Sequence, residues 1–178
     1  GNIAFFSFKS QDARNRFETA LSLSQNKDIE VLNAVGRANS NFDDKNGDPN
    51  YAIEKLKIAT AIKKFKDPDT YVNMGDAYRM LMDGGNAQIS YQSALNIDPN
   101  YARALYRIGK IYQTQGVNQE EIYMKYFNEA IAKDPAYAPV YKNLSDLYYN
   151  TDVTKSATYF DKYLANTDDA PKICYYKA

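Results

Sequence analysis

Apolar side chains recur every three or four positions along most of this chain. Two neighbouring sets show the spacing most clearly: Tyr71, Met74, Tyr78 and Leu81, then Ala87, Tyr91, Ala94 and Leu95. Residues spaced in this way fall on one side of a helix and form an apolar face. No segment alternates β-branched and polar residues with a period of two, so we expect no strands. The pattern predicts an all-α protein of about nine amphipathic helices.

The pattern also repeats between residues 68 and 150, with a period close to 34 residues. The first helix of each copy carries a bulky residue, an apolar residue followed by a small one, and a tyrosine: Tyr71, Met74, Gly75 and Tyr78; Leu105, Ile108, Gly109 and Tyr112; Tyr141, Leu144, Ser145 and Tyr148. The second helix carries small and aromatic residues: Ala87, Tyr91 and Ala94; Phe127 and Ala130; Phe160 and Tyr163. Upstream, shorter matches occur at Leu32, Val35 and Gly36, at Ala52, Leu56 and Ala59, and at Ala13, Phe17 and Ala20. Repeated helix pairs of this kind bury their apolar faces against one another.

The spacing resembles the signature of the tetratricopeptide (TPR) repeat, and the resemblance is most complete over residues 68–135. It implies a right-handed superhelical solenoid of antiparallel helix pairs, which we expect to form a single array over residues 1–178. The expected units are 1–26 (partial), 27–67, 68–101, 102–135, 136–169 and 170–178 (partial). Since the first and last units are incomplete, we expect the chain to be a piece of a longer bacterial TPR-repeat protein.

Small residues and prolines give this interpretation a physical basis. Gly36, Gly75 and Gly109 remove side-chain bulk where paired helices would approach closely, and the tyrosines fill the larger gaps. Prolines follow aspartates at Pro68, Pro99 and Pro135, and proline fits the first turn of a helix. We therefore expect these prolines to mark the joins between successive units.

Composition excludes several classes of chemistry. The 22 basic and 22 acidic residues balance, which gives no overall attraction to nucleic acid or to an anionic membrane. The absence of histidine removes Ser-His-Asp and Cys-His catalysis and histidine-bearing zinc sites. Cys174 is the only cysteine, and we expect a buried thiol there. We expect no catalytic residue, cofactor or metal site, although a glycosidase built on two carboxylates needs no histidine and stays open.

Two loops contain residue types found in ligand-binding loops, but at spacings that do not match those of a calcium-binding or a phosphate-binding loop. The run from Asp43 to Asp48 lacks the spaced oxygen ligands and distal glutamate of a helix-loop-helix calcium site, so we interpret it as a solvated loop. Gly84 and Gly85 lack the lysine of a phosphate-binding loop and predict a turn between helices. No apolar run approaches the roughly 20 residues that a bilayer span requires.

The family resemblance implies a function in protein binding. TPR proteins hold an extended peptide or a partner helix along the first helices, in a concave groove. We expect a protein or peptide partner and no nucleic acid, with self-association left open. The alternative is an ancillary structural or self-association domain of a larger enzyme or sensor. The tyrosine-rich composition resembles that of bacterial periplasmic TPR proteins and lipoproteins, which favours an extracytoplasmic location.

A more specific expectation comes from TPR domains that bind the acidic C-terminal tails of heat-shock chaperones with a carboxylate clamp. The positions that match their clamp are Asn33, Arg37, Asn73, Arg103 and Arg107. The first pair departs from the family, with asparagine in place of lysine and arginine in place of asparagine. Arginine forks pair with carboxylates in two hydrogen bonds, and asparagine amides donate to a peptide backbone, so the resemblance implies a site for an acidic peptide end.

Further first-helix residues extend this candidate site. Lys110 lies one turn after Arg107 and would add positive charge. Tyr106 and Tyr149 are off the repeat face, and we expect them to project from their helices and offer stacking surfaces. In the other interpretation, which stays open, the two arginines are solvated or paired with Asp76.

Overall fold

The computed structural model describes residues 9–25, 27–41, 47–62 and 67–167. Within these ranges the chain forms nine α-helices and one short 3-10 helix, with no strand, which confirms the expected all-α fold. The helices are α1 (Lys9–Leu23), α2 (Ile29–Asn39), α3 (Pro49–Ala61), α4 (Pro68–Met80), α5 (Gly84–Ile97), α6 (Ala102–Thr114), α7 (Glu120–Lys133), α8 (Ala138–Tyr148) and α9 (Val153–Asn166), with the 3-10 helix at Val117–Gln119 before α7.

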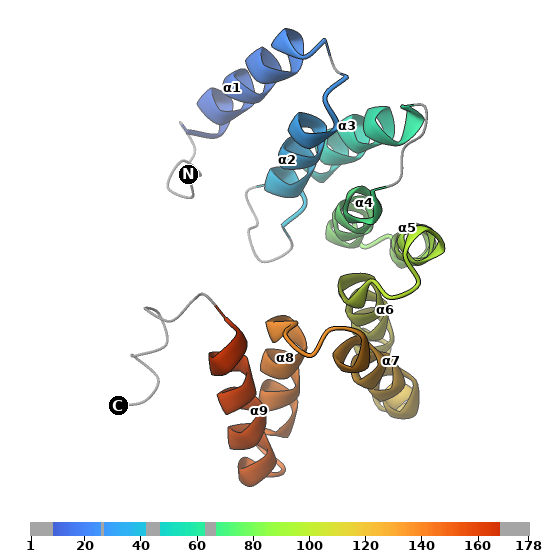
Figure 1. Ribbon diagram of the computed structural model, residues 1–178, viewed down its shortest axis with the longest axis vertical. Coiled ribbons are helices and arrows are strands. Elements are labelled where there is room, and N and C mark those ends of the chain that lie inside the picture. The colour runs from blue at the N-terminus through green and yellow to red at the C-terminus, as the bar shows by residue number, and fades with distance from the viewer. Residues whose placement is uncertain (1–8, 26, 42–46, 63–66, 168–178) are drawn as a thin grey trace. The chain divides into compact units, whose positions relative to one another are not determined.

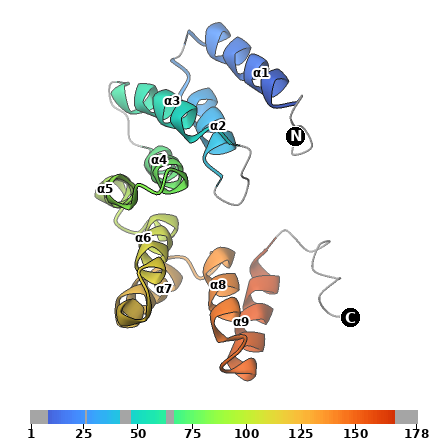
Figure 2. The same ribbon diagram turned by 180° about the vertical axis from the view of Figure 1, so that it is seen from behind.

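Consecutive helices pack as pairs within two compact units (Figures 1 and 2). In the unit Gly1–Pro99, α2 packs on α3 and α4 on α5, while α3 also contacts α4. In the unit Asn100–Ala178, α6 packs on α7 and α8 on α9. The expectation of one array over the whole chain stays a prediction.

Each first helix carries a small residue where its partner comes closest. A Cβ built on Gly36 would lie 2.4 Å from Leu56 Cδ2, and one on Gly75 would lie 2.4 Å from Tyr91 Cε1. Such distances are shorter than any real Cβ contact, so only glycine fits without a shift of its neighbours. The predicted role of these glycines is therefore confirmed.

The second unit continues this arrangement with different side chains. A Cβ on Gly109 would lie 2.6 Å from Phe127 Cε1. In the last pair Ser145 takes the glycine position, and both it and Ser156 of α9 are buried. The Ser156 hydroxyl donates to the Ser145 backbone oxygen at 2.9 Å. This hydrogen bond satisfies a buried polar group at the crossing of the two helices.

Among the tyrosines at repeat positions, Tyr91 and Tyr141 are buried in the core, while the others are half-buried: Tyr71, Tyr78, Tyr112, Tyr148 and Tyr163. Tyr91 and Phe127 have no exposed surface. The Tyr91 hydroxyl is satisfied because it donates to Asp76 Oδ1 at 2.7 Å, and Asp76 is itself only 2% exposed. Burying a carboxylate that accepts a hydrogen bond from a phenol costs less free energy than burying one without a donor. The Tyr91 hydroxyl thus links α5 to α4 by a hydrogen bond at the same crossing that the apolar part of its ring fills.

Aspartates cap many of the helices, but the prolines do not all begin them. Asp67 accepts from the Asp69 backbone nitrogen, and Pro68 begins α4. Pro99 and Pro135 lie in the turns that connect α5 to α6 and α7 to α8 along the chain. Each of these prolines directly follows the C-cap residue of the preceding helix, where the fixed φ of proline suits a turn as well as a helix. Cys174, residues 43–46 and the expected last unit lie outside the described residues.

The glycine crossings generate a stability prediction. Gly75→Leu and Gly109→Leu should each lower the free energy of unfolding by about 1 to 3 kcal/mol, because the new side chain must displace an aromatic ring. Urea denaturation of each variant measures the loss. Gly84→Ala is the matched control, since a Cβ there would meet nothing within 4 Å. Equal midpoints for the control and the two leucine variants would mean that the crossings tolerate bulk.

Candidate functional site

The candidate site residues of the first unit lie on the facing first helices α2 and α4, where a buried polar tie joins them. Asn33 donates through Nδ2 to Asp67 Oδ2, and its Oδ1 accepts from the Thr70 hydroxyl. Asn33 is 7% exposed and Thr70 has no exposed surface. A buried amide with both ends satisfied holds two helices in register. Asn33 therefore links the α2 helix to the start of α4.

A second tie lies beside the first and is partly open to solvent. Arg37 Nη2 is 3.1 Å from Asp69 Oδ2, with the arginine side chain 65% exposed and the aspartate 22%. Asn73 is fully buried, and its Nδ2 donates to the same Asp69 oxygen at 3.4 Å. The structure thus brings Arg37 and Asn73 to one carboxylate of their own chain.

The candidate residues of the second unit form a basic row along α6. Arg103, Arg107 and Lys110 follow one another at intervals of four and three residues, and each is half-buried. Lys110 Nζ donates to Gln113 Oε1 at 2.7 Å and to Asn143 Oδ1 of α8 at 2.6 Å. The row therefore extends from α6 onto the first helix of the next pair.

Asn143 was not identified from the sequence, although it stands two residues before Ser145, as Asn73 does before Gly75. A lysine only donates hydrogen bonds, so the Asn143 carbonyl oxygen must face Lys110 and its Nδ2 must point elsewhere. Nδ2 is buried and has no acceptor among the described residues. Comparing helix positions between repeats could have revealed this amide.

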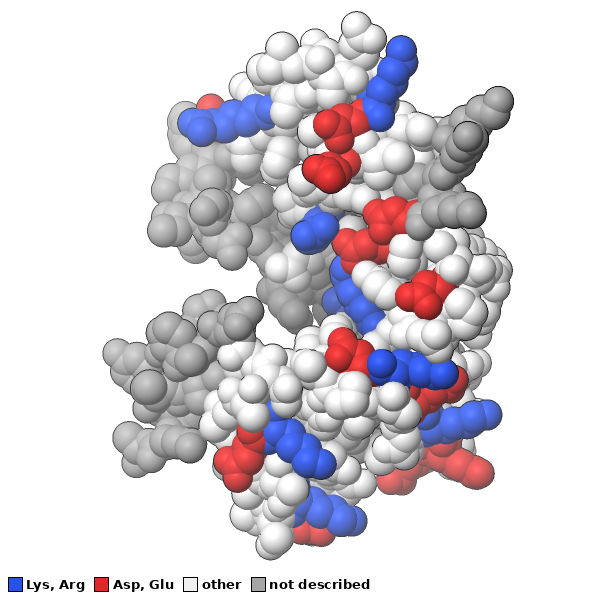
Figure 3. All heavy atoms as spheres, viewed as in Figure 1, with Lys and Arg blue, Asp and Glu red and all other residues white. Residues whose placement is uncertain are grey.

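Helices α4 and α6 carry opposite charge at two matching positions. Asp69 and Asp76 of α4 stand at the repeat positions that Arg103 and Lys110 occupy in α6. Asp76 was named from the sequence only as a possible partner of the two arginines, and Asp69 was not identified. On the face shown in Figure 3, basic and acidic side chains lie interspersed over the surface. The charge contrast is therefore local to the first helices.

The expected position of Tyr106 was wrong. Its side chain is only 7% exposed, and its ring centroid lies 5.6 Å from that of Phe127 and 5.7 Å from that of Tyr137. Tyr137 precedes α8, and packing against the next repeat covers the ring. Tyr149 is 70% exposed, as expected.

The described residues contain no group of three or more acidic, histidine or cysteine side chains placed to hold a metal ion. Among the helices that the structure describes, none is both long and apolar enough to cross a bilayer.

The two ties of the first unit should differ in strength. Asn33→Ala should lower the free energy of unfolding by about 1 to 3 kcal/mol, because Thr70 and Asp67 lose a buried partner. Arg37→Ala breaks a mostly exposed ion pair and should cost less than about 1 kcal/mol. Urea midpoints of the two variants test this order. An Arg37→Ala loss equal to or above that of Asn33→Ala would contradict the assignment of the structural tie to Asn33.

Comparison with known proteins places this geometry in a wider context. A family model described as TPR repeat matches residues 87–116. No curated protein matches the sequence. A solved thermophilic TPR protein of Thermus thermophilus, TTC0263, aligns with a TM-score of 0.73 at 20% identity, over 95% of this chain and 89% of that one.

Two other solved structures share the fold. MamA aligns with a TM-score of 0.61 at 22% identity, over 92% of both chains. A chain from the APC/C hetero-tetramer Cut9-Hcn1 aligns with a TM-score of 0.64 at 17% identity, over 90% of this chain and 31% of that one. Residues 87–116 thus match the TPR repeat, and the chain has the fold of TPR solenoid proteins.

Proposed function

We propose that this chain is a protein-interaction scaffold whose first helices bind an extended peptide or a partner helix. The TPR fold is that of a scaffold for protein–protein interaction, and first helices of repeated pairs offer a continuous surface. The observation that carries the finer proposal is the basic row on α6, with Asn143 of α8 beside it.

The chemistry of this row fits an acidic peptide. Arg103 and Arg107 can each hold a carboxylate by two parallel hydrogen bonds, and half-burial makes such bonds stronger than in open water. Lys110 adds a third positive charge. Asn143 Nδ2 is buried, so this amide would orient Lys110 through its Oδ1 and would not contact the peptide itself. A peptide with acidic side chains or a free carboxylate end is the ligand class that these groups would bind.

The first-unit residues have a different place in the proposal. Asn33 and Arg37 of α2 already contact Asp67 and Asp69, so they would fix the spacing of α2 and α4, and Asn73 would hold Asp69 in place within α4. Tyr106 would support α6 from within the core. The acidic end of the peptide is therefore assigned to the second unit, and the clamp-like first pair to a structural role.

The proposal also covers the source and the cellular location of the protein. A bacterial source is supported by the likeness to the Thermus thermophilus protein, and an extracytoplasmic location by composition alone. We propose no catalytic role or cofactor. The alternative, an ancillary or self-association domain of a larger protein, would leave the basic row without a peptide ligand.

A peptide-binding measurement tests the proposal. Five-residue peptides rich in glutamate, with free or amidated C-termini, should bind the chain, and binding should weaken as salt is raised. The Arg103→Ala, Arg107→Ala double variant should bind at least about tenfold more weakly, since it loses two charge-assisted contacts. Fluorescence anisotropy measures these affinities, with circular dichroism to confirm that the helices remain.

The matched control variant removes two lysines of the same unit in place of the two arginines. Lys142 and Lys155 are exposed on α8 and α9, so the Lys142→Ala, Lys155→Ala variant has the same net charge as the arginine variant. Equal weakening by both variants would reduce the effect to general charge and contradict a site on α6. Equal binding by the arginine variant and the original chain would contradict it too.

A further inference from the structure

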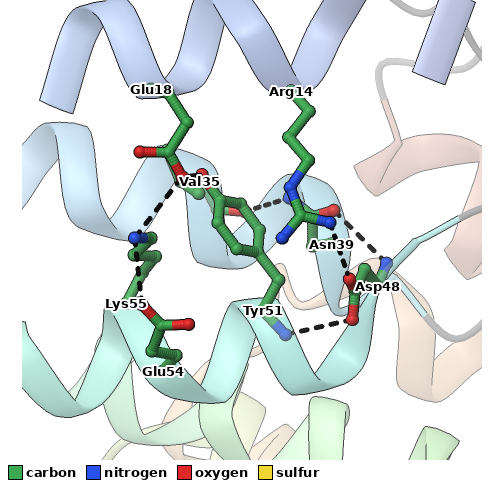
Figure 4. A network of polar contacts seen from close by, with 8 residues as sticks. All are labelled: Arg14, Glu18, Val35, Asn39, Asp48, Tyr51, Glu54 and Lys55. Carbon is green, nitrogen blue, oxygen red and sulfur yellow. Dashed lines mark hydrogen bonds and ion pairs between the residues drawn. The ribbon is translucent and has the colours of Figure 1, made fainter. Parts of the chain in front are cut away.

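Helix α1 docks on α3 through a network of charged and aromatic side chains (Figure 4). Arg14 Nη1 lies 3.2 Å from Asp48 Oδ2, the residue that also caps α3. The same guanidinium stands 4.3 Å from the centre of the Tyr51 ring. A cation over an aromatic face adds attraction to the ion pair, so Arg14 contacts two features of α3 at once.

One turn further along α1, the sign of the charge reverses. Glu18 Oε1 accepts a hydrogen bond from the Tyr51 hydroxyl at 2.7 Å and lies 3.4 Å from Lys55 Nζ. The Tyr51 hydrogen bond lowers the pKa of Glu18, and burial raises the pKa of Tyr51. The Lys55 side chain is only 11% exposed and also contacts Glu54 at 3.0 Å. A positive then a negative residue on α1 therefore meet a negative then a positive residue on α3.

The apolar part of this contact is small. Leu21 is the one fully buried side chain among residues 12–23 of α1, and it joins a cluster with Leu32, Val35, Tyr51 and Ala59. Phe17 packs against the same cluster. The docking face of α1 thus consists of Arg14, Phe17, Glu18 and Leu21. Since few apolar groups are buried, α1 belongs to the part of a fold that opens most readily.

The connection from α1 to α2 is short and contains a left-handed residue. Helix α1 ends at Leu23 and α2 begins at Ile29. Between them Gln25 has φ of 54°, a conformation that costs a non-glycine residue about 1 to 2 kcal/mol. A short connection with strain of this kind favours exchange of the element that it holds.

We propose that the surface of α2 and α3 that α1 covers also receives the α1 of a second copy of this chain, so that two copies exchange their α1 helices. A second copy carries the one helix already shown to match the charges of Asp48 and Lys55. Every contact of α1 is the same in the closed and the exchanged form, so the hinge and the entropy of association decide between them. The exchange is independent of the peptide site on α6.

Complementary charge reversals test the exchange. Glu18→Lys places two lysines together within one chain, and Lys55→Glu places two glutamates together. When both variants are unfolded in urea and refolded as a mixture, the exchanged heterodimer restores opposite charges at both contacts. With an affinity tag on the Glu18→Lys chain, the Lys55→Glu chain should co-purify at least about tenfold more than an untagged Glu18→Lys chain does.

Light scattering of the eluted species should give twice the monomer mass for the mixture. The Glu18→Lys, Lys55→Glu double variant restores the pair within one chain, and its urea midpoint and helix content show that the reversed pair folds. If the mixed variants remain monomers while that double variant folds, the exchange is wrong. Co-purification of the two like-charged Glu18→Lys chains at the same level would also overturn it.

Discussion

The close crossing of the two helices in each pair is the constraint on which the rest of this structure depends. At Gly36, Gly75 and Gly109 the partner side chain occupies the space that a Cβ would need. Because a large residue enters that space from the second helix, the pair has one register and one spacing. In the last pair, two serines that hydrogen bond across the crossing fix the register and spacing of the two helices. The crossing therefore fixes which residues of the first helix remain at its outer face.

The first-helix positions outside the crossing carry the polar contacts of the molecule. In the first unit, Asn33 of α2 donates to Asp67 and so holds α2 against the start of α4, while Asn73 donates to Asp69 within α4. In the second unit, the same kind of position holds arginines and a lysine that contacts Asn143 of the next first helix. One scaffold thus uses its outer row for cohesion in one unit and for positive charge in the other. Repeat proteins can vary this row because core and outer positions are separate on each helix.

The sequence predicted what depends on local periodicity. Helix number, the glycine crossings and the burial of Tyr91 and Phe127 follow from spacing along one or two helices. The burial of Tyr106 could not be predicted from this local spacing, because Tyr137 of the next repeat covers its ring. The contacts of Asn33 and Glu18 join residues more than 30 positions apart, and a single sequence does not reveal which partners meet.

A double-mutant cycle over Gly75 and Tyr91 tests the central constraint most directly. Gly75→Ala adds the Cβ that would lie 2.4 Å from Tyr91 Cε1, and Tyr91→Leu removes that ring atom. If the crossing is the constraint described above, alanine should cost less in the Tyr91→Leu background than alone, with a coupling free energy of about 1 kcal/mol or more from urea unfolding. Losses that add to within about 0.3 kcal/mol would contradict the account, because they would show that the two sites do not compete for the same space.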